Sequence, residues 1–370
     1  MLRTALLSLF LFLSLFQTGW AQNDRIRFRD ANEKDARCDI IDMTWRKVSF
    51  YLVAGGQQIR QDRATKEIRE VIFGDGSKPF DYKSAENLMN NGRYEEAVSK
   101  FEKAKRNPRC SSALKQTAGR NIAICYYYSG DYDRAINFAQ QFRKENPNTY
   151  YLAETYQLEY DAHQAKSPPD LRKMGRTVED FTRAANSKNS EWKKPAGIMR
   201  AGLLEFQKKW SEALGIYSNS SYQSDLVVGT QAKLGELRVL SIMQKWSPLK
   251  SKAKAIFRDA KKKTLEETLL MGANIAQGDV ELSSGNTKEA IYSYLRAALQ
   301  LHTSGDPSRE HETALGRASI ACSRYATSLK DPEKKAEYQN IARQLIGELG
   351  RSYPGSPLLS KAQDEVNKIR

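Results

Sequence analysis

The pattern of hydrophobic positions changes its period once along the chain, close to Pro79. Between Arg25 and Phe73, β-branched and aromatic residues alternate with polar ones in short runs, and Gly55-Gly56 lies between two of them. Period-two alternation around a Gly-Gly pair indicates a β-hairpin. We expect a small β module over 22–78, with three to five strands in an SH3-like or Sm-like meander. A docking or oligomerisation module and an N-terminal cap on the following domain both fit this pattern.

From residue 79 onward the period is helical, and an internal repeat becomes visible. Small and large residues recur at offsets that allow two antiparallel helices to pack closely. The first copy contains Ala85, Leu88, Gly92, Tyr94, Ala97, Phe101, Ala104 and Pro108. The second contains Ala123, Tyr126, Gly130, Tyr132, Ala135, Ala139, Phe142 and Pro147. Two weaker copies have their turns at Lys208 and Gly285.

The spacing of these turns predicts further hairpins. Gly92 and Gly130 are 38 residues apart, whereas the next two intervals are 78 and 77 residues, so each long interval should hold one more turn, near 168 and 246. Helix-breaking segments occur there, Pro168-Pro169 and Trp246-Ser247-Pro248. Another hairpin is expected over 308–352, broken at Lys330-Asp331-Pro332, and then a closing helix from Ser356 to Ile369.

The predicted fold class is therefore mainly α. It is an α-solenoid of about seven helical hairpins over 79–352 with a C-terminal capping segment at 353–370. At the residues of the first two copies, above all Gly92-Arg93-Tyr94-Glu95-Glu96-Ala97, the chain resembles the tetratricopeptide repeat (TPR) family. This resemblance implies a scaffold that binds protein or peptide partners in a concave groove lined by the first helix of each hairpin.

Carried onto this sequence, the resemblance implies a set of groove residues in the first two hairpins. They are Tyr82, Glu86, Met89, Asn90, Arg120, Ile124, Tyr127 and Tyr128. Tyrosine is concentrated here, and its ring combines rigid contact area with a polar group, as recognition surfaces require. The alternative is that many of these tyrosines, including Tyr126, Tyr132 and Tyr156, pack between repeats.

The first 21 residues have the layout of a secretory signal peptide. Arg3 precedes an apolar run from Ala5 to Phe16, and Gly19-Trp20-Ala21 supplies a cleavage site. The competing interpretation is a membrane anchor, which normally needs about 20 apolar residues. Near the other end, Tyr353-Pro354-Gly355-Ser356-Pro357 is similar to a repeat junction of the outer-membrane assembly lipoproteins and the Tol-Pal-associated division coordinator. We expect an exported protein, periplasmic or secreted, that begins at Gln22.

A formal charge of +15, from 59 basic and 44 acidic residues, favours an acidic partner. Basic residues gather around the predicted fifth hairpin: Lys252, Lys254, Arg258, Lys261, Lys262 and Lys263. As an alternative function, this face could hold an anionic envelope polymer or a membrane surface. A solvated helix face is the plain alternative, and a nucleic-acid role is disfavoured for an exported chain.

The sequence contains no arrangement that indicates catalysis, a metal or a cofactor. The three histidines, His163, His302 and His311, are not spaced as metal ligands. The four cysteines are expected to be buried free thiols, although an exported chain could oxidise them. We therefore predict a non-enzymatic protein with no cofactor.

Overall fold

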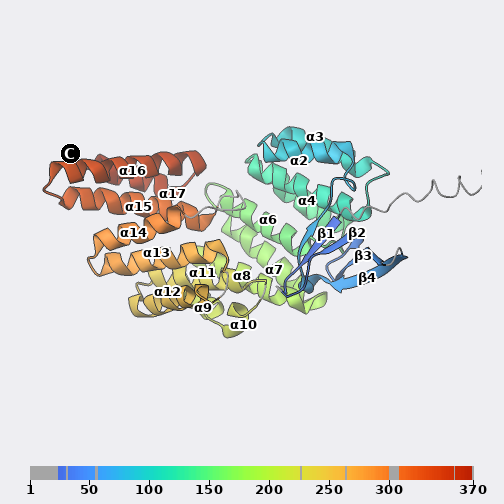
Figure 1. Cartoon of the computed structure of the whole chain (residues 1–370), viewed down its shortest axis with the longest axis horizontal. Helices are drawn as coiled ribbons and strands as arrows, with labels where there is room; N and C mark the ends of the chain where they lie inside the picture. The colour runs from blue at the N-terminus through green and yellow to red at the C-terminus, as the bar shows by residue number, and fades with distance from the viewer. Residues whose placement is uncertain are drawn as a thin grey trace, which may run out of the picture. The chain divides into compact units, whose positions relative to one another are not determined.

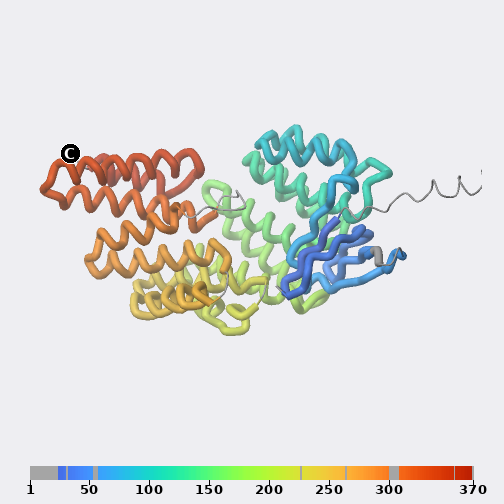
Figure 2. The backbone as a smooth tube through the Cα atoms, viewed as in Figure 1, coloured from blue at the N-terminus to red at the C-terminus, as the bar shows by residue number. Residues whose placement is uncertain are grey.

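The computed structural model describes residues 24–368, apart from 31, 55–56, 226, 263–264, 300–307 and 354. The predicted signal peptide, 1–21, lies outside the described residues. The contacts divide the chain into two compact units, Met1–Met199 and Arg200–Arg370, which are described separately below. Figure 1 labels the elements of each unit, and Figure 2 traces the backbone through them.

Unit 1 begins with a five-stranded antiparallel sheet in the order β4-β3-β2-β1-β5. The first four strands follow one another as a meander, as predicted, and β5 returns to pair with β1. A short 3-10 turn, Thr65–Glu67, separates β4 from β5. The likeness to an SH3 or Sm fold stays a prediction. The strands are β1 Asp24–Phe28, β2 Ala36–Met43, β3 Lys47–Ala54, β4 Gln57–Ala64 and β5 Ile68–Ile72.

Three helical hairpins complete unit 1, and each second helix begins a few residues after the first one ends. Side-chain oxygens of Ser111, Asp131 and Asp170 accept hydrogen bonds from the first-turn amides of the helices that follow them, which fixes where those helices begin. Pro168-Pro169 falls between two helices, as predicted. The helices are α2 Phe80–Asn90, α3 Tyr94–Arg106, α4 Ser112–Tyr128, α5 Tyr132–Glu145, α6 Leu152–Ala165 and α7 Leu171–Ser187, followed by the 3-10 turn Ser190–Trp192.

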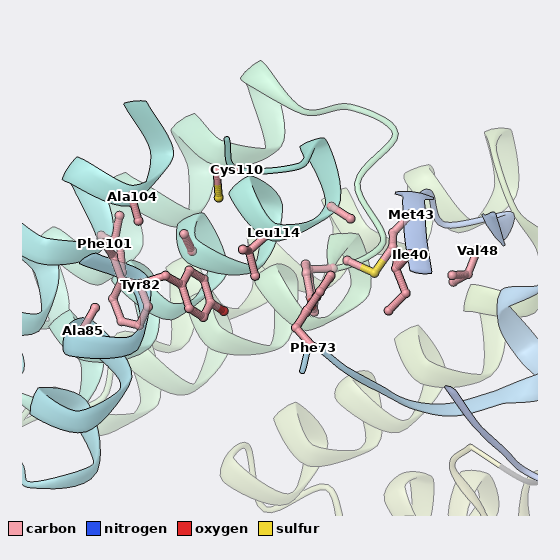
Figure 3. Close-up of a cluster of buried hydrophobic side chains, with 14 of the residues drawn as sticks. Ile40, Met43, Val48, Phe73, Tyr82, Ala85, Phe101, Ala104, Cys110 and Leu114 are labelled. Carbon is pink, nitrogen blue, oxygen red and sulfur yellow. The ribbon is translucent and has the colours of Figure 1, made fainter. Parts of the chain in front are cut away.

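The sheet and the first helices share one hydrophobic core. Figure 3 shows Ile40, Met43 and Val48 of the sheet in the same cluster as Tyr82 and Leu114 of the helices. Polar contacts reinforce this interface: the Gln116 amide on α4 donates to the Met43 carbonyl at 3.0 Å. The sheet therefore covers the N-terminal half of α4, and its apolar face gains burial that a small sheet would lack alone.

Unit 2 continues the series of hairpins, with the division between the units falling inside α8. Together with unit 1, the described residues hold seven hairpins, the number that the sequence predicts, and the closing helix is present as α17. The helices are α8 Lys193–Phe206, α9 Trp210–Tyr217, α10 Ser220–Gln223, α11 Gly229–Ile242, α12 Trp246–Ala260, α13 Glu267–Ser283, α14 Thr287–Ala298, α15 Arg309–Ser328, α16 Pro332–Ser352 and α17 Pro357–Asn367.

Five hairpin turns share one backbone feature, a residue in the left-handed region two positions after the last residue of the first helix. Gly92, Gly130 and Gly285 have φ between 74° and 82°, and Lys208 and Gln244 have φ of 58° and 55°. Each turn closes with paired hydrogen bonds to the last helical carbonyls, for example Gly92 N to Met89 O at 3.0 Å and Arg93 N to Leu88 O at 2.9 Å. These bonds satisfy carbonyls that the helix end leaves unpaired.

The turn of the fifth hairpin lies close to residue 246, as the spacing predicts, but the segment assigned as its helix break is wrong. Trp246-Ser247-Pro248 does not break the chain but forms the first turn of α12, and the turn itself lies at 243–245 around Gln244. The reason is that a proline in the first turn of a helix removes an amide that has no intrahelical partner. The proline therefore marked the helix start, not the preceding turn.

Candidate functional site

The first helices α2 and α4 of unit 1 carry the groove residues that the resemblance implies. For one of these residues, Tyr82, the prediction is wrong. Tyr82 is 1% exposed, and its ring packs edge-on against Phe101 with the centroids 5.4 Å apart. It belongs to the hydrophobic core and cannot offer its ring to a partner. One turn further along α2, Glu86 accepts two bonds from the Lys78 ammonium at 2.7 and 3.0 Å. Met89 is half-buried, and Asn90 is exposed.

On α4, Arg120 connects two successive first helices. Its Nε donates to Glu154 of α6 at 2.7 Å, its NH2 group forms an ion pair with the same carboxylate, and NH1 donates to Asn121 at 3.0 Å. The guanidinium also lies over the Tyr151 ring, 5.8 Å from its centroid. Arg120 and Ile124 are half-buried, so both present part of their surface to solvent.

The end of α4 carries an aromatic cluster that joins three helices. Tyr128 stacks on Tyr94 at 5.8 Å and meets Tyr127 edge-on at 5.4 Å, and Tyr127 contacts Tyr132 at 5.7 Å. Tyr127 also packs against the cluster of Ala135, Ile136 and Ala162. It therefore contributes to packing between hairpins, whereas Tyr128, at 39% exposed, is the more accessible ring.

Two acidic residues of α6 extend this surface, and the sequence reasoning missed both. Glu154 is the partner of Arg120, and Asp161 lies close enough to Tyr127 for its charge to help burial raise the pKa of that phenol. Burial raises the pKa of Asp161 to about 6, although Gln157 donates to it at 2.8 Å. Their spacing of seven residues on one helix face is the signal that could have identified them. We call Glu86, Met89, Asn90, Arg120, Ile124, Tyr127, Tyr128, Glu154 and Asp161 the first-helix face of unit 1.

Unit 2 contains a cleft that the sequence reasoning also missed. It has a volume of about 110 Å³ and lies between the first helices α11, α13 and α15. Arg238, Arg309 and Arg317 line it together with apolar side chains that include Leu237, Ile242 and Ile275. We call this the arginine cleft. No sequence pattern pointed to it because Arg238 and its partner Glu310 are 72 residues apart.

A network of ion pairs holds the walls of the arginine cleft. Arg238 of α11 donates to Glu205 at 3.0 Å and to Glu310 of α15 at 3.2 Å, so it bridges helices that are two hairpins apart. Arg317 is paired with Asp279, which also accepts a bond from the Tyr294 hydroxyl at 2.7 Å. Burial would raise the pKa of Glu205, but the positive charges of Arg238 and Arg309 hold it below its usual value.

The predicted basic face is only partly available. Lys252 pairs with Glu236 at 2.9 Å, so it is engaged within the fold, and Lys263 lies outside the described residues. Lys254, Arg258, Lys261 and Lys262 are exposed and make no ion pair within the described part of the chain. Lys250 is exposed in the same way. Offsets of four, four and three residues from Lys250 to Lys261 place these side chains along one side of α12.

The remaining candidate features are the cysteines, possible metal ligands and membrane-spanning helices. All four cysteines are buried free thiols, as predicted, and burial raises the pKa of Cys38, Cys125 and Cys322 to about 12. Among the described residues, no group of three or more histidine, cysteine or acidic side chains is placed to hold a metal ion. The same residues include no helix long and apolar enough to cross a membrane.

Comparisons with known proteins agree with this architecture. A family model described as "Tetratricopeptide repeat" matches residues 118–149, which cover the C-terminal part of α4, the Gly130 turn and α5. No curated protein matches the sequence.

Among solved structures, a tetratricopeptide repeat protein from Parabacteroides merdae is similar with a TM-score of 0.50 at 8% identity, covering 79% of this chain and 100% of its own. The type IV pilus biogenesis factor PilW has a TM-score of 0.40 at 12% identity, covering 67% and 98%. The TPR2AB domain of yeast Sti1, solved as a complex with pHSP90, has a TM-score of 0.26 at 14% identity, covering 78% and 97%. A tetratricopeptide repeat model thus matches one hairpin of the chain, and the fold of the chain is similar to that of a tetratricopeptide repeat protein.

Proposed function

We propose that this protein is a non-catalytic scaffold that binds a protein or peptide segment on the first-helix face of unit 1. The observation that carries the proposal is the composition of that face. It places an accessible tyrosine, a half-buried arginine and two carboxylates on neighbouring helices, outside the hydrophobic core. Aromatic and arginine side chains dominate the binding energy of protein interfaces. Repeat proteins of this architecture use such extended surfaces for binding.

The test is affinity capture with the full chain from an extract of its own cells. Tyr128→Ala should remove the captured partner, because truncation of an interface hot spot costs about 2 kcal/mol or more. Tyr292→Ala is the matched control, since Tyr292 is a tyrosine of similar exposure, 47%, on α14 of unit 2. Retention of the partner by Tyr128→Ala, or equal loss with Tyr292→Ala, would count against the first-helix face.

A second candidate function rests on the exposed basic side chains of α12 and of the residues directly after it. In the described part of the chain five exposed basic side chains make no ion pair, and together they form a surface suited to an anionic envelope polymer or membrane. Attachment of this kind weakens steeply with ionic strength. Neutralising Lys254, Arg258 and Lys261 together to Gln should then abolish attachment to an envelope fraction and remove its salt dependence. Attachment that survives this triple change would exclude the basic face.

We also propose that the chain is exported and cleaved after Ala21, as the layout of residues 1–21 indicates. N-terminal sequencing of the protein from its own cells should begin at Gln22. A sequence that begins at Met1 or Leu2 in an exported fraction would contradict cleavage.

A further inference from the structure

We propose that two copies of this chain form a two-fold dimer in which their β4 strands pair antiparallel along their outer edges. The inference concerns the sheet of unit 1 and goes beyond the proposed scaffold function, on which it does not rest. It starts from a strand edge that the fold leaves open.

The open edge belongs to β4, Gln57–Ala64. This strand is the last one in the order β4-β3-β2-β1-β5, and among the described residues it pairs with β3 alone. Figure 1 shows it at the border of the sheet. All eight of its residues pair with β3 in one unbroken register, without the proline or bulge that often protects an edge. Its outer side is therefore a regular row of backbone donors and acceptors, which a further strand can extend.

The hydrogen-bond pattern shows which residues of β4 face the open edge. The amide of Thr65, directly after β4, donates to the Arg46 carbonyl of the β3 side at 3.0 Å. Backbone groups alternate in direction along an antiparallel strand, and the register is continuous, so the odd-numbered residues of β4 point towards β3. The open edge is formed by the amides and carbonyls of the even-numbered residues: Gln58, Arg60, Asp62 and Ala64.

Charge favours one register for two such edges. Outward-facing residues must lie opposite one another, and a two-fold axis at Gln61 places Arg60 opposite Asp62 of the partner subunit, twice by symmetry. Directly opposed side chains lie on the same face of the sheet, so each pair brings opposite charges together. Moving the axis to Arg60 or to Asp62 would instead place two like charges opposite each other. The register about Gln61 aligns residues 58–64 of both strands and is self-complementary.

The two charged side chains are available for these pairs. Arg60 is 60% exposed, and its Nε lies 3.9 Å from Asp62 of its own strand. Asp62 accepts bonds from Lys47 and from the Ser49 hydroxyl of β3, yet it remains 41% exposed. A carboxylate has about four lone-pair positions, so Asp62 can accept a guanidinium from the open side as well.

The opposite face of β4 contributes apolar contact. Ile59 lies opposite Leu52 of β3 and extends an apolar row to the edge, where it is 46% exposed. In the proposed register it lies opposite Arg63 of the partner subunit. Glu33 pairs with the guanidinium of Arg63, so the methylene groups of that side chain are placed to cover Ile59. Pairing of the edges would thus bury an apolar side chain that a single chain exposes.

The first experiment is sedimentation velocity of the full chain. A pair of strands covers less area than a standard interface, so we expect a monomer–dimer equilibrium with a Kd of about 10 µM, followed from about 1 to about 200 µM protein. Raising the salt from about 0.05 to about 0.5 M should weaken the dimer about threefold, because the two ion pairs are exposed and therefore screened.

A charge exchange between two variants locates the interface. Arg60→Asp alone and Asp62→Arg alone each place like charges opposite one another, so each should weaken the homodimer about tenfold or more. In an equal mixture the first variant presents two acids to the two bases of the second, and a heterodimer with about the wild-type Kd should form. Native mass spectrometry separates this heterodimer from both homodimers by mass.

Two further variants complete the test. Arg69→Asp is the matched control, because Arg69 is an exposed arginine on β5, the other edge of the sheet, and the change should alter the Kd less than about twofold. Gln58→Pro removes one outward amide and leaves the bonds to β3 in place. It should weaken the dimer about tenfold, and it keeps the proposal testable if Asp62→Arg, which loses its contacts with Lys47 and Ser49, fails to fold.

The inference is overturned if the wild type stays monomeric at about 200 µM, well above the expected Kd. It is also overturned if the folded charge variants do not form a heterodimer, or if Arg69→Asp weakens the dimer as much as Arg60→Asp does. A monomeric chain that loses a captured partner on Gln58→Pro would assign the open edge to a segment of another protein, against the self-pairing proposed.

Discussion

Two glycines of unit 2 should respond to the same substitution with opposite signs. Gly278 lies within α13 at the point where α14 packs against it. A Cβ at this position would lie 2.5, 2.6 and 2.9 Å from three carbons of the Tyr294 ring. That ring is 1% exposed, and its hydroxyl is bound to Asp279, so it cannot move aside easily. At Gly347, within α16, a Cβ would meet nothing within 4 Å apart from the adjacent residues and the backbone of its own helix.

The magnitudes follow from two competing effects. Alanine in place of glycine inside a helix gains about 0.5 to 1 kcal/mol at either position, because the unfolded chain loses less entropy on folding. At Gly278 the new methyl group must also be accommodated in a close-packed contact, and overpacking costs about 1 to 3 kcal/mol. Three ring atoms closer than 3 Å place this cost in the upper part of that range. We expect Gly278→Ala to destabilise by about 1 to 2 kcal/mol net, and Gly347→Ala to stabilise by up to about 1 kcal/mol.

Urea unfolding of the full chain, followed by far-ultraviolet circular dichroism, measures both changes as shifts in midpoint at constant slope. Adding Tyr294→Leu to Gly278→Ala should recover part of the loss, because the shorter side chain leaves room for the methyl group. The packing argument is refuted if Gly278→Ala is as stable as the wild type. It is also refuted if Gly347→Ala lowers the midpoint as much as Gly278→Ala does.

Three further predictions concern the turns, the buried acid and the thiols. Lys208→Gly and Gln244→Gly should each stabilise the fold by about 1 kcal/mol, because φ values of 58° and 55° strain any residue with a Cβ. Lys209→Gly is the control, since Lys209 has a φ of −87° and should gain no stability from the change. Urea midpoints measure all three changes, and equal effects at the three positions would contradict the turn argument. The folded pKa of Asp161 is raised to about 6 from 3.8, so the folded state binds the proton more tightly and stability falls as the pH rises from about 4 to 6. Asp161→Asn should therefore stabilise at pH 7.5 by about 1 to 3 kcal/mol and flatten this dependence in thermal melts at several pH values, and a lower melting temperature at pH 7.5 would refute it. Titration with a thiol reagent in the absence of reductant should find four reactive cysteines in denaturant and almost none in the folded protein. In the folded protein burial shields the thiols and raises the pKa of Cys38, Cys125 and Cys322 to about 12. A count of two in denaturant would indicate a disulfide.

The sequence alone determined the series of hairpins, because the signals involved are local. Helix periodicity, a residue that tolerates positive φ, and a side chain that caps a first turn all act within a few residues of one another. The turns at Gly92, Gly130, Lys208 and Gly285 were therefore found directly, and the break at Pro168-Pro169 followed from their spacing. The fifth turn also lies close to the predicted residue 246, but the assignment of Trp246-Ser247-Pro248 as the helix break failed for a local reason, since proline is compatible with the first turn of a helix.

The candidate surfaces depended on tertiary structure. Tyr82 has the same tyrosine signal as Tyr128, yet it is buried because the sheet and the α2–α3 hairpin close over one core. The bridge from Arg238 to Glu310 joins residues 72 positions apart, and the pairing of Lys252 with Glu236 removes one cation from the predicted basic face. The rotation between successive hairpins decides which side chains of distant first helices meet, and it results from packing summed over many contacts. No short segment of sequence determines this packing. The hairpins could therefore be predicted, whereas the contacts between side chains of distant first helices could not.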